Sequence, residues 1–284
     1  MTASQVTVTV RPLASVEEYR ACQEVQRRAW GIAEEGYLIP VATMISVQHA
    51  GGLVLGAFID QRLVGFSFAY LGRVEGQWAL YSQLTGVDPS AQDHGIGGRL
   101  KAAQREWTRE QGLALVVWSF DPLQAGNANF NLHRLGAICR TYYPNYFGER
   151  SDALNAGLET DRLLALWDTA DQRHRWQGDG QTLVTLLGSD VRRDELLTPS
   201  GSKSAEAIAA GPEPTWLQIQ IPPDFAALKA RDARLARAWQ EAVRLAFRQA
   251  FAAGYAAMDF HREGAGDEAR CWYELRRPVE GSEQ

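Results

Sequence analysis

The sequence of 284 residues is short of cysteine, with three in all. Cys22, Cys139 and Cys271 are widely separated and odd in number, which is unlike a disulfide framework and suits a reducing cytoplasm. They also lack the close spacing of the ligand pairs in structural zinc sites. The sequence therefore predicts a cytoplasmic protein without a metal.

Long apolar runs, a secretory signal and an excess of basic residues are also missing. No uninterrupted apolar run approaches the roughly 20 residues of a membrane-spanning helix, and residues 1–5 have neither the basic nor the apolar part of a signal peptide. The net charge of −5 and the pI near 5.6 argue against nucleic acid, since a phosphate backbone requires a concentrated basic surface. We expect a globular protein with no membrane and no nucleic-acid partner, long enough for one large or two modest domains.

The most informative stretch of the sequence is residues 80–120, where a glycine-rich loop joins a strand to a helix. In chain order it reads as an apolar strand over 80–87, a turn at Asp88 and Pro89, the loop 92–98, a helix over 99–111 and a second apolar strand over 113–120. The first N–H groups of a helix have no partner within the helix, and the peptide dipoles add partial positive charge there. Glycine leaves room for a phosphate to accept these N–H groups. The stretch therefore predicts a phosphate site.

The spacing of the loop distinguishes among the known phosphate loops. It lacks the Lys-Ser/Thr ending of a P-loop and the final glycine of a dinucleotide-binding loop. Five residues match the pattern V-x-P-x-x-[RQ]-x-x-G-x-[GA], namely Val87, Pro89, Gln92, Gly95 and Gly97. In these positions the sequence resembles the acetyl-coenzyme A loop of the GNAT acyltransferases. A tight turn without a ligand is the alternative interpretation.

The predicted order of elements also resembles the GNAT fold. A capping box at Ser15 and Glu18 begins a helix that reaches about Trp30. The other predicted elements are strands over 6–10, 53–59, 63–71, 138–143 and 162–167, and helices over 38–50 and 125–135. The order β-α-α-β-β-β-α-β-α-β-β covers residues 5–168. The resemblance implies an α+β fold, with a mixed, centrally splayed sheet flanked by helices.

The rest of the chain is predicted to add a C-terminal region. Its expected elements are strands over 181–188, 216–221, 255–260 and 271–276, a long helix over 224–253, and loops over 198–204 and 211–214. Strand, helix and strand repeat the order of the loop stretch, but Pro222, Pro223 and Asp224 stand where the glycines would be. A degenerate second GNAT half and a chance similarity both explain this. The predicted division is 1–168 for the acyl-CoA-binding domain, 169–215 for a connecting segment and 216–284 for a C-terminal β-α-β-β region.

The resemblance implies which residues bind acyl-CoA. The pyrophosphate would be surrounded by Gln92, Asp93, His94, Gly95, Ile96, Gly97, Gly98 and Arg99. The pantetheine arm would pair with backbone groups of Leu84, Gly86 and Val87 like an extra strand. Gln92 stands where arginine is commoner, so Arg99 or Lys101 would supply the cation. Asn127 and Asn131, one helical turn apart, would bond coenzyme A or the acceptor, with solvent-facing asparagines as the alternative.

Acyl transfer requires a neutral amine, and a carboxylate or histidine can remove its proton. Asp121 follows the strand 113–120 and is the candidate base, although Asp-Pro is also a usual turn. The tyrosine that GNAT enzymes often use as the acid is replaced by Leu132. A hydroxyl of Tyr142 or Tyr146 would then take its place, with Asn145 holding the acceptor; plain aromatic packing is the other interpretation.

Arginines recur along the predicted helix 224–253, at positions 231, 234, 237, 244 and 248. The favoured interpretation is a solvated face partly paired with Asp232 and Glu241, and the minority one is a surface for an anionic acceptor or partner.

These features predict an acyl-CoA-dependent N-acyltransferase, acetyl or succinyl, that acts on a primary amine of a small molecule such as an amino acid. Transfer is expected to be direct, because Cys22 and Cys139 lack the neighbouring histidine of a nucleophilic thiol. A non-catalytic acyl-CoA-binding or sensor protein is the alternative. The oligomeric state is open, with a homodimer among the options.

Overall fold

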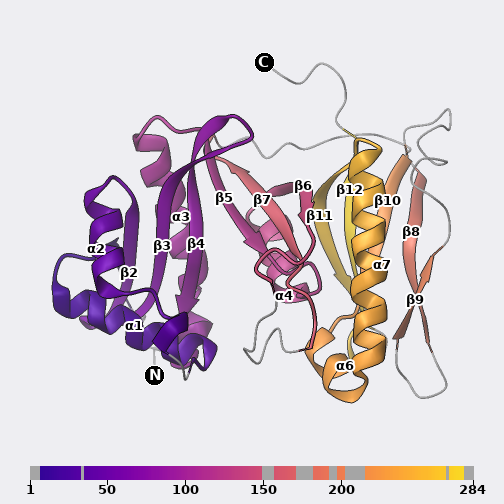
Figure 1. Ribbon diagram of the computed structural model, residues 1–284, viewed down its shortest axis with the longest axis horizontal. Coiled ribbons are helices and arrows are strands. Elements are labelled where there is room, and N and C mark those ends of the chain that lie inside the picture. Colours follow the sequence, from indigo (N-terminus) through magenta and orange to yellow (C-terminus); the bar gives the residue numbers. More distant parts are fainter. Residues whose placement is uncertain are drawn as a thin grey trace, which may run out of the picture. The chain divides into compact units, whose positions relative to one another are not determined.

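The computed structural model describes residues 7–32, 35–148, 157–170, 182–191, 197–201, 215–266 and 269–277 (Figure 1). It divides into two compact units. The first consists of Met1–Trp118 with Asp168–Gln172, and the second of Ser119–Trp167 with Arg173–Gln284. The sequence-based division at residue 168 stays a prediction. In the described residues, no helix is long and apolar enough to cross a membrane.

The first unit is a sheet with helices on both faces. In chain order its elements are β1 (Val8–Pro12), α1 (Val16–Trp30), η1 (Glu35–Tyr37), α2 (Val41–His49), β2 (Leu53–Ile59), β3 (Arg62–Val74), β4 (Gln77–Val87), η2 (Pro89–His94), α3 (Ile96–Glu110) and the start of β5 (Leu115–Phe120). The strands lie in the order β1-β2-β3-β4-β5, antiparallel except for the parallel pair β4 and β5.

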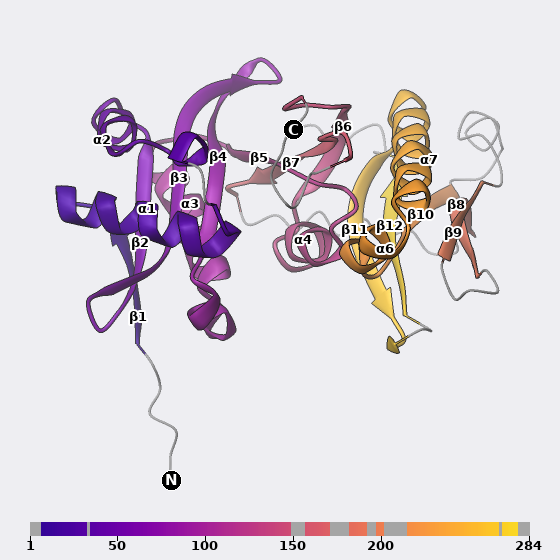
Figure 2. The same ribbon diagram turned by 60° about the horizontal axis from the view of Figure 1, so that its bottom comes forward.

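Two hydrophobic clusters hold the helices of the first unit to opposite faces of its sheet. Phe58, Phe66 and Phe68 pack with residues of α1 and α2, whereas Leu55 and Val64 pack with residues of α3. Figure 2 shows α1 in front of the strands. Because successive side chains of a strand point to opposite faces, β2 and β3 are buried on both. The α3 helix and the loop before it are thus fixed to the sheet.

The start of α1 is as the sequence predicts. The Ser15 side chain accepts a hydrogen bond from the Glu18 backbone N–H, and Gly31, at a φ of 62°, closes the helix. The Glu18 carboxylate accepts a hydrogen bond from the Ala14 backbone N–H at 2.7 Å, and backbone hydrogen bonds from Ala14 and Ser15 both help to lower the pKa of Glu18.

The second unit contains the remaining strands. In chain order its elements are the end of β5, α4 (Ala125–Ala128), the π-helix η3 (Asn129–Arg134), β6 (Ile138–Tyr143), β7 (Arg162–Asp168), β8 (Thr182–Val191), β9 (Leu197–Gly201), β10 (Thr215–Ile221), α6 (Phe225–Arg231), α7 (Ala233–Ala252), β11 (Ala256–Glu263) and β12 (Arg270–Arg276). The strands lie in the order β7-β6-β11-β12-β10-β8-β9. Neighbours are antiparallel except for β8 and β10, which are parallel.

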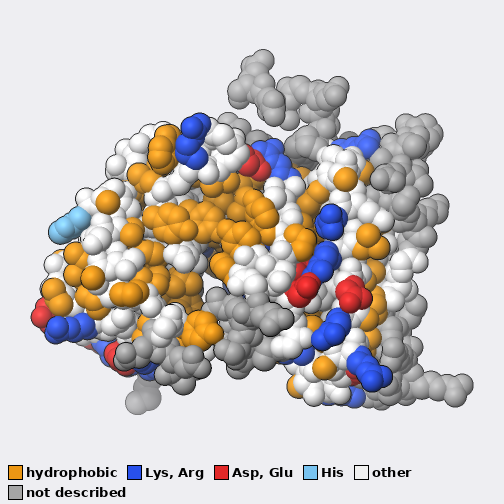
Figure 3. Space-filling view, in the orientation of Figure 1, with side chains coloured by type: hydrophobic (Ala, Val, Ile, Leu, Met, Phe, Trp, Pro, Cys, Tyr) orange, Lys and Arg blue, Asp and Glu red, His pale blue; other side chains and the backbone are white. Residues whose placement is uncertain are grey.

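Aromatic packing joins α7 to the strands of the second unit. Trp239 and Phe247 of α7 are fully buried. The Phe247 ring meets that of Tyr273 edge to face, with centroids 4.9 Å apart, and Tyr273 meets Phe260 in the same way. The outer face of α7 carries basic and acidic side chains (Figure 3). The helix is therefore amphipathic, with one face in the core and the other in solvent.

The element order expected for residues 5–168 is confirmed, as is the mixed sheet flanked by helices. The single long helix predicted over 224–253 is wrong. It breaks at Asp232, whose backbone is extended and whose carboxylate accepts from the N–H groups of Arg234 and Leu235, 2.9 Å from each. Aspartate favours such a cap over a helix interior.

One other expectation for the C-terminal part also differs from the structure. Residues 198–201 of the predicted loop 198–204 belong to β9, which pairs with β8 at the end of the strand order. Pro199 is tolerated there because one side of an edge strand needs no ladder bonds. The loop predicted over 211–214 lies outside the described residues. The similarity to the loop stretch is one of order only, because β12 lies between β10 and β11 whereas β4 and β5 pair directly.

Candidate functional site

The glycine-rich loop of the first unit ends at the start of α3. Gly95 has a φ of 65° and precedes the first turn, where no side chain caps the helix and no acidic residue is present. A Cβ atom added at Gly95, Gly97 or Gly98 would meet nothing within 4 Å. Packing therefore does not explain the glycines at positions 97 and 98. Each of them costs the helix about 1 kcal/mol relative to alanine. The open space over free N–H groups fits a phosphate.

A buried carboxylate holds the entrance to this loop. Asp88 accepts hydrogen bonds from the backbone N–H and the hydroxyl of Ser90, at 3.0 and 2.8 Å, and from Nε of Arg28 at 2.7 Å. Burial opposes the charged form, but the bonds from Ser90 and Arg28 outweigh it and lower the pKa of Asp88. Asp88 therefore stays ionised and ties the loop to α1.

Replacing Asp88 with asparagine is expected to destabilise the protein by about 1–2 kcal/mol at neutral pH, because a neutral amide forms weaker bonds with Ser90 and Arg28. Since the pKa is lowered by folding, the stabilisation is present above the unfolded pKa and is lost as the pH falls through the folded one. Urea unfolding of both proteins from pH 7 into the acidic range measures this. A deficit that does not shrink with acid would contradict the prediction.

The other residues predicted around the pyrophosphate differ in exposure. Gln92 and His94 are exposed, and the Asp93 side chain lies outside what the structure describes. The Ile96 side chain is fully buried in the core, so only its backbone faces the loop. The Arg99 guanidinium lies 3.5 Å from the Val8 carbonyl oxygen.

Lys101 does not supply a cation to the loop, because its side chain is buried against the sheet. Its amine donates to Oγ of Ser82 at 2.9 Å and lies 3.8 Å from the centre of the Trp118 ring. Burial lowers the pKa of Lys101 to about 7. The sequence interpretation of Lys101 as a phosphate contact is therefore wrong.

The parallel strands β4 and β5 pair at two positions only among the described residues. Their paired positions are Leu80 with Val116 and Tyr81 with Val117. A bulge follows in β4, since Phe68 and Ala69 of β3 face Leu84 and Ser82 and leave Gln83 as the extra residue. A bulge bends its strand and leaves the extra residue outside the ladder. Beyond Tyr81, the described residues of β5 form no further pairs with β4, which leaves the backbone groups of this edge for an extended ligand.

The residues predicted along the pantetheine arm lie on this part of β4. Leu84 packs in the cluster with α1 and α2, and Val87 in that with α3. A Cβ on Gly86 would come within 2.8 Å of the Phe66 ring and 3.1 Å of the Trp30 ring. Packing alone thus explains the glycine at 86, and any ligand contact there involves the backbone.

The candidate base Asp121 lies in the second unit. Its carboxylate accepts from the Leu123 N–H at 2.9 Å and from the Gln124 amide at 3.3 Å, as in an Asx turn. Burial raises the pKa of Asp121, although the Leu123 N–H and Arg162 favour the charged form. The group combines a turn role with a raised affinity for protons.

Asn127 and Asn131 do not share the helical face that their spacing suggested. The backbone changes from α-helix to π-helix at Asn129, and a π-helix rotates successive residues differently. Asn127 is exposed, whereas Asn131 is buried. Their contact with coenzyme A or the acceptor stays a prediction.

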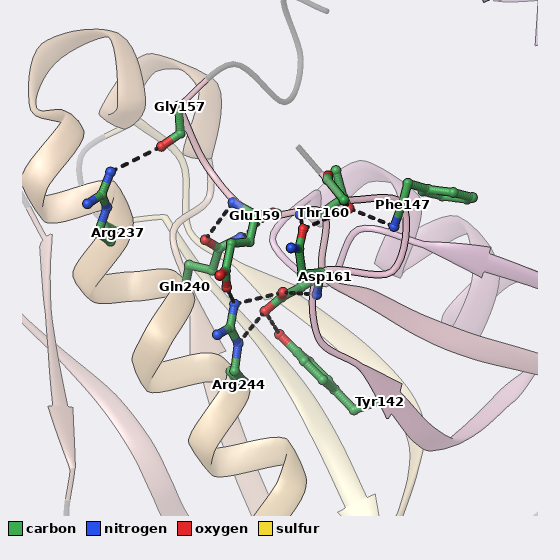
Figure 4. Close-up of polar contacts among 11 residues, drawn as sticks. Tyr142, Phe147, Gly157, Glu159, Thr160, Asp161, Arg237, Gln240 and Arg244 are labelled. Atoms are coloured by element: carbon green, nitrogen blue, oxygen red, sulfur yellow. Dashed lines mark hydrogen bonds and ion pairs between the residues drawn. The ribbon is translucent and has the colours of Figure 1, made fainter. Parts of the chain in front are cut away.

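A polar network within the second unit contains Tyr142 (Figure 4). The Tyr142 hydroxyl donates to Asp161 at 2.6 Å, and the Asn145 backbone N–H donates to the same carboxylate at 2.9 Å. Arg244 of α7 donates to both Asp161 oxygens at 2.8 Å and pairs with Glu159. Burial and the Asp161 charge raise the pKa of Tyr142. Arg244 therefore departs from the solvated face that the sequence favoured for the arginines of this helix, because its partners Glu159 and Asp161 lie far away along the chain.

The aromatic residues from the end of β6 onward, Tyr143, Tyr146 and Phe147, form an exposed cluster instead of core. Tyr146 is 43% exposed, and its ring contacts those of Tyr143 and Phe147, with centroids 5.1 and 4.7 Å away. Tyr143 is also exposed, so the plain aromatic packing that the sequence allowed for this segment does not hold for Tyr143. The Asn145 side chain accepts from the Thr160 N–H at 3.3 Å, at a backbone φ of 44°. Asn145 therefore helps to shape this segment.

The described part of the chain has neither an activated thiol nor a metal cluster. Burial raises the pKa of Cys22 to about 12 and that of Cys139 further, so neither is a thiolate at neutral pH. No group of three or more His, Cys, Asp or Glu residues in the described ranges is arranged to hold a metal.

Comparison with known proteins finds likeness at the level of structure. No protein-family model and no curated protein sequence matches the chain. One similar structure is the ribosomal-protein-S18-alanine N-acetyltransferase of Escherichia coli. The alignment covers 61% of this chain and 100% of that protein, with 16% identity and a TM-score of 0.46. The putative acetyltransferase yncA of Salmonella typhimurium, solved with acetyl-CoA, aligns with 58% over 96% of its own, at 17% identity and 0.48.

A putative acetyltransferase of the GNAT family from Desulfovibrio desulfuricans aligns with 58% of this chain over 100% of its own, at 16% identity and a TM-score of 0.43. At such low identity and TM-scores, these likenesses concern the backbone and not the residues of the site.

Proposed function

We propose that the chain is an acyl-CoA-dependent N-acyltransferase of the GNAT type that acts on a primary amine of a small molecule. The observation that supports it most is that two features follow one another along the chain. Within the described residues, the strand β4 has an unpaired, bulged edge, and a glycine-rich helix start comes soon after its end. The edge begins after Tyr81, and the helix start at Gly95 follows the same strand's end. A thioester-bearing nucleotide needs both features, whereas a free phosphate needs only the second.

The phosphates of the donor would bind at the start of α3. Backbone N–H groups of residues 95–98 supply the donors, and the helix dipole favours negative charge there. Asp88 holds the loop in place through Ser90 and Arg28. No basic side chain is required over this cradle, which agrees with Gln92 in the position of the commoner arginine.

The pantetheine arm would extend along the open edge of β4 from Val87 toward Gln83. The arm has about twelve bonds between phosphate and sulfur, and about four residues of backbone contain the same number of bonds. Such a chain is roughly 14 Å long when extended. Four residues back from Val87 is Gln83, the extra residue of the bulge. Its N–H, outside the ladder, would donate to the thioester oxygen and stabilise the charge that develops there.

Acyl transfer then needs a proton acceptor for the amine and a donor for the leaving thiolate. Asp121 is the proposed acceptor, because its raised pKa makes it a better base than an ordinary carboxylate. Tyr142 and Tyr146 are the proposed donors. Tyr142 already donates its proton to Asp161, so this role would require that bond to break, whereas the Tyr146 side chain is exposed. Asn145 is proposed to orient the acceptor.

Acetyl-CoA at 100-fold excess over its Kd is expected to stabilise the protein by about 2.7 kcal/mol, because it binds only the folded chain. Thermal unfolding with and without acetyl-CoA measures this, and release of free thiol with a panel of amino acids and polyamines measures turnover. Binding without turnover for any acyl donor would favour the acyl-CoA sensor. If no acyl-CoA stabilises the protein, both the enzyme and the sensor are rejected.

A further inference from the structure

Three buried polar side chains of the first unit meet behind the point where β4 leaves β5. Ser82, Lys101 and Gln104 are 3%, 4% and 0% exposed. The Lys101 amine donates to Oγ of Ser82 at 2.9 Å, and that hydroxyl donates to Oε1 of Gln104 at 3.0 Å. The amine also lies 3.8 Å from the centre of the Trp118 ring. We call Ser82, Lys101 and Gln104 the buried polar cluster. Its residues belong to α3 and β4 alone.

The buried polar cluster has more donors than acceptors, because the Gln104 amide nitrogen has no acceptor and Lys101 has no counter-charge among the described residues. Nε2 of Gln104 is buried and has no partner among the described residues. Within the same residues Lys101 forms no ion pair, and burial alone accounts for its lowered pKa. A buried ammonium without a counter-charge and a buried amide N–H without an acceptor are both unfavourable. An oxygen anion beside them would satisfy both.

The cluster lies where the acyl group of the proposed donor would arrive. Ser82 directly follows Tyr81, the last residue of β4 paired with β5, and Trp118 directly follows Val117, its counterpart on β5. The estimate from the pantetheine arm places the thioester at Gln83, the next residue after Ser82. Because Ser82 and Trp118 directly follow the last paired residues of β4 and β5, Lys101 flanks the place where the acyl chain would extend.

We propose that Lys101 and Gln104 form a subsite for a carboxylate on the acyl group, so that the preferred donor is an acyl-CoA whose acyl chain ends in a carboxylate. The inference rests on the proposed function and specifies its donor. The ammonium supplies charge and the Gln104 amide a hydrogen bond, whereas an acetyl group has no atom that can accept either. The carboxylate in turn favours the protonated form of Lys101.

The test compares succinyl-CoA with acetyl-CoA by calorimetric titration of the full-length protein. We expect the wild type to bind succinyl-CoA at least tenfold more tightly, and Lys101→Met to reduce this ratio at least tenfold. Methionine is similar in size and apolar, so it suits the buried position; Lys101→Gln serves if that variant fails to fold. Lys229→Met is the matched control, since the chain has only three lysines, Lys101, Lys203 and Lys229.

A pH series separates an ion pair from mere packing. The preference for succinyl-CoA should fall as the pH rises and Lys101 loses its proton, whereas the coenzyme A part, common to both donors, cancels in the ratio. Ser82, Gln104 and Trp118, which face the amine, do not titrate in this range. Lys101→Arg keeps its charge and should flatten the pH dependence.

Three outcomes decide the matter. An affinity ratio near one that Lys101→Met does not change would overturn the subsite while leaving the acyltransferase intact. If Lys101→Met instead alters the preference for acceptors with and without a carboxylate, measured with acetyl-CoA, the anion belongs to the acceptor and the donor assignment is wrong. Failure of both acyl-CoAs to bind would reject the proposed function itself.

Discussion

Replacing Gly97 with leucine is expected to weaken acyl-CoA binding by more than 100-fold without destabilising the protein. The added side chain would fill the space over the N–H groups at the start of α3, where phosphate would lie. A Cβ at this position meets no atom within 4 Å outside the helix's own backbone, so the start of the new side chain has room. Leucine is the better helix former by close to 1 kcal/mol, so stability should stay equal or rise.

Gain of stability together with loss of binding distinguishes a ligand site from a structural turn. Calorimetric titration with acetyl-CoA and urea unfolding of the same preparation measure the two effects. Gly72→Leu on β3 is the matched control, since a Cβ there also meets nothing within 4 Å. If the Gly97 variant is folded and binds acetyl-CoA like the wild type, the loop does not hold phosphate.

Replacing Arg244 with leucine is expected to destabilise the protein by about 3–5 kcal/mol, the usual effect of removing one partner from a buried ion pair. The Asp161 side chain is 1% exposed, and it would lose its two bonds with the guanidinium. The remaining donors, the Tyr142 hydroxyl and the Asn145 N–H, do not neutralise its charge.

A double-mutant cycle shows whether the pair itself is responsible. Asp161→Asn in the Arg244→Leu background should restore part of the loss, because the buried charge is then gone. Arg248→Leu, on the exposed side of the same helix, should change stability by less than about 0.5 kcal/mol. Urea unfolding of the four proteins measures these differences. Equal losses for Arg244 and Arg248 would show that the network does not stabilise the second unit.

This network also bears on the aromatic segment after β6. Asp161 links Tyr142 and Asn145 to α7, so loss of Arg244 should loosen the segment that carries the candidate acid and acceptor residues. If those residues have their proposed roles, the KM for the amine should rise in the Arg244 variant while the affinity for acetyl-CoA changes little.

Several features of the site could be predicted because their causes are local. The match of Val87, Pro89, Gln92, Gly95 and Gly97 lies within eleven residues, and the structure places those residues from the end of β4 to the first turn of α3. Other features depend on partners far along the chain. Arg244 and Asp161 are 83 positions apart, and Lys101 and Ser82 are 19 positions apart. No spacing rule could have paired them.

The sequence by itself determined the element order of the first 168 residues and the place of the glycine-rich helix start, because strand periodicity, capping and glycine content act over a few residues. Only the tertiary structure decided that the helix near Asp232 breaks, that β4 leaves β5 after Tyr81, and that Lys101 is buried there instead of reaching the loop. These outcomes depend on which side chains the folded chain brings together and removes from water, and that is a property of the packed whole.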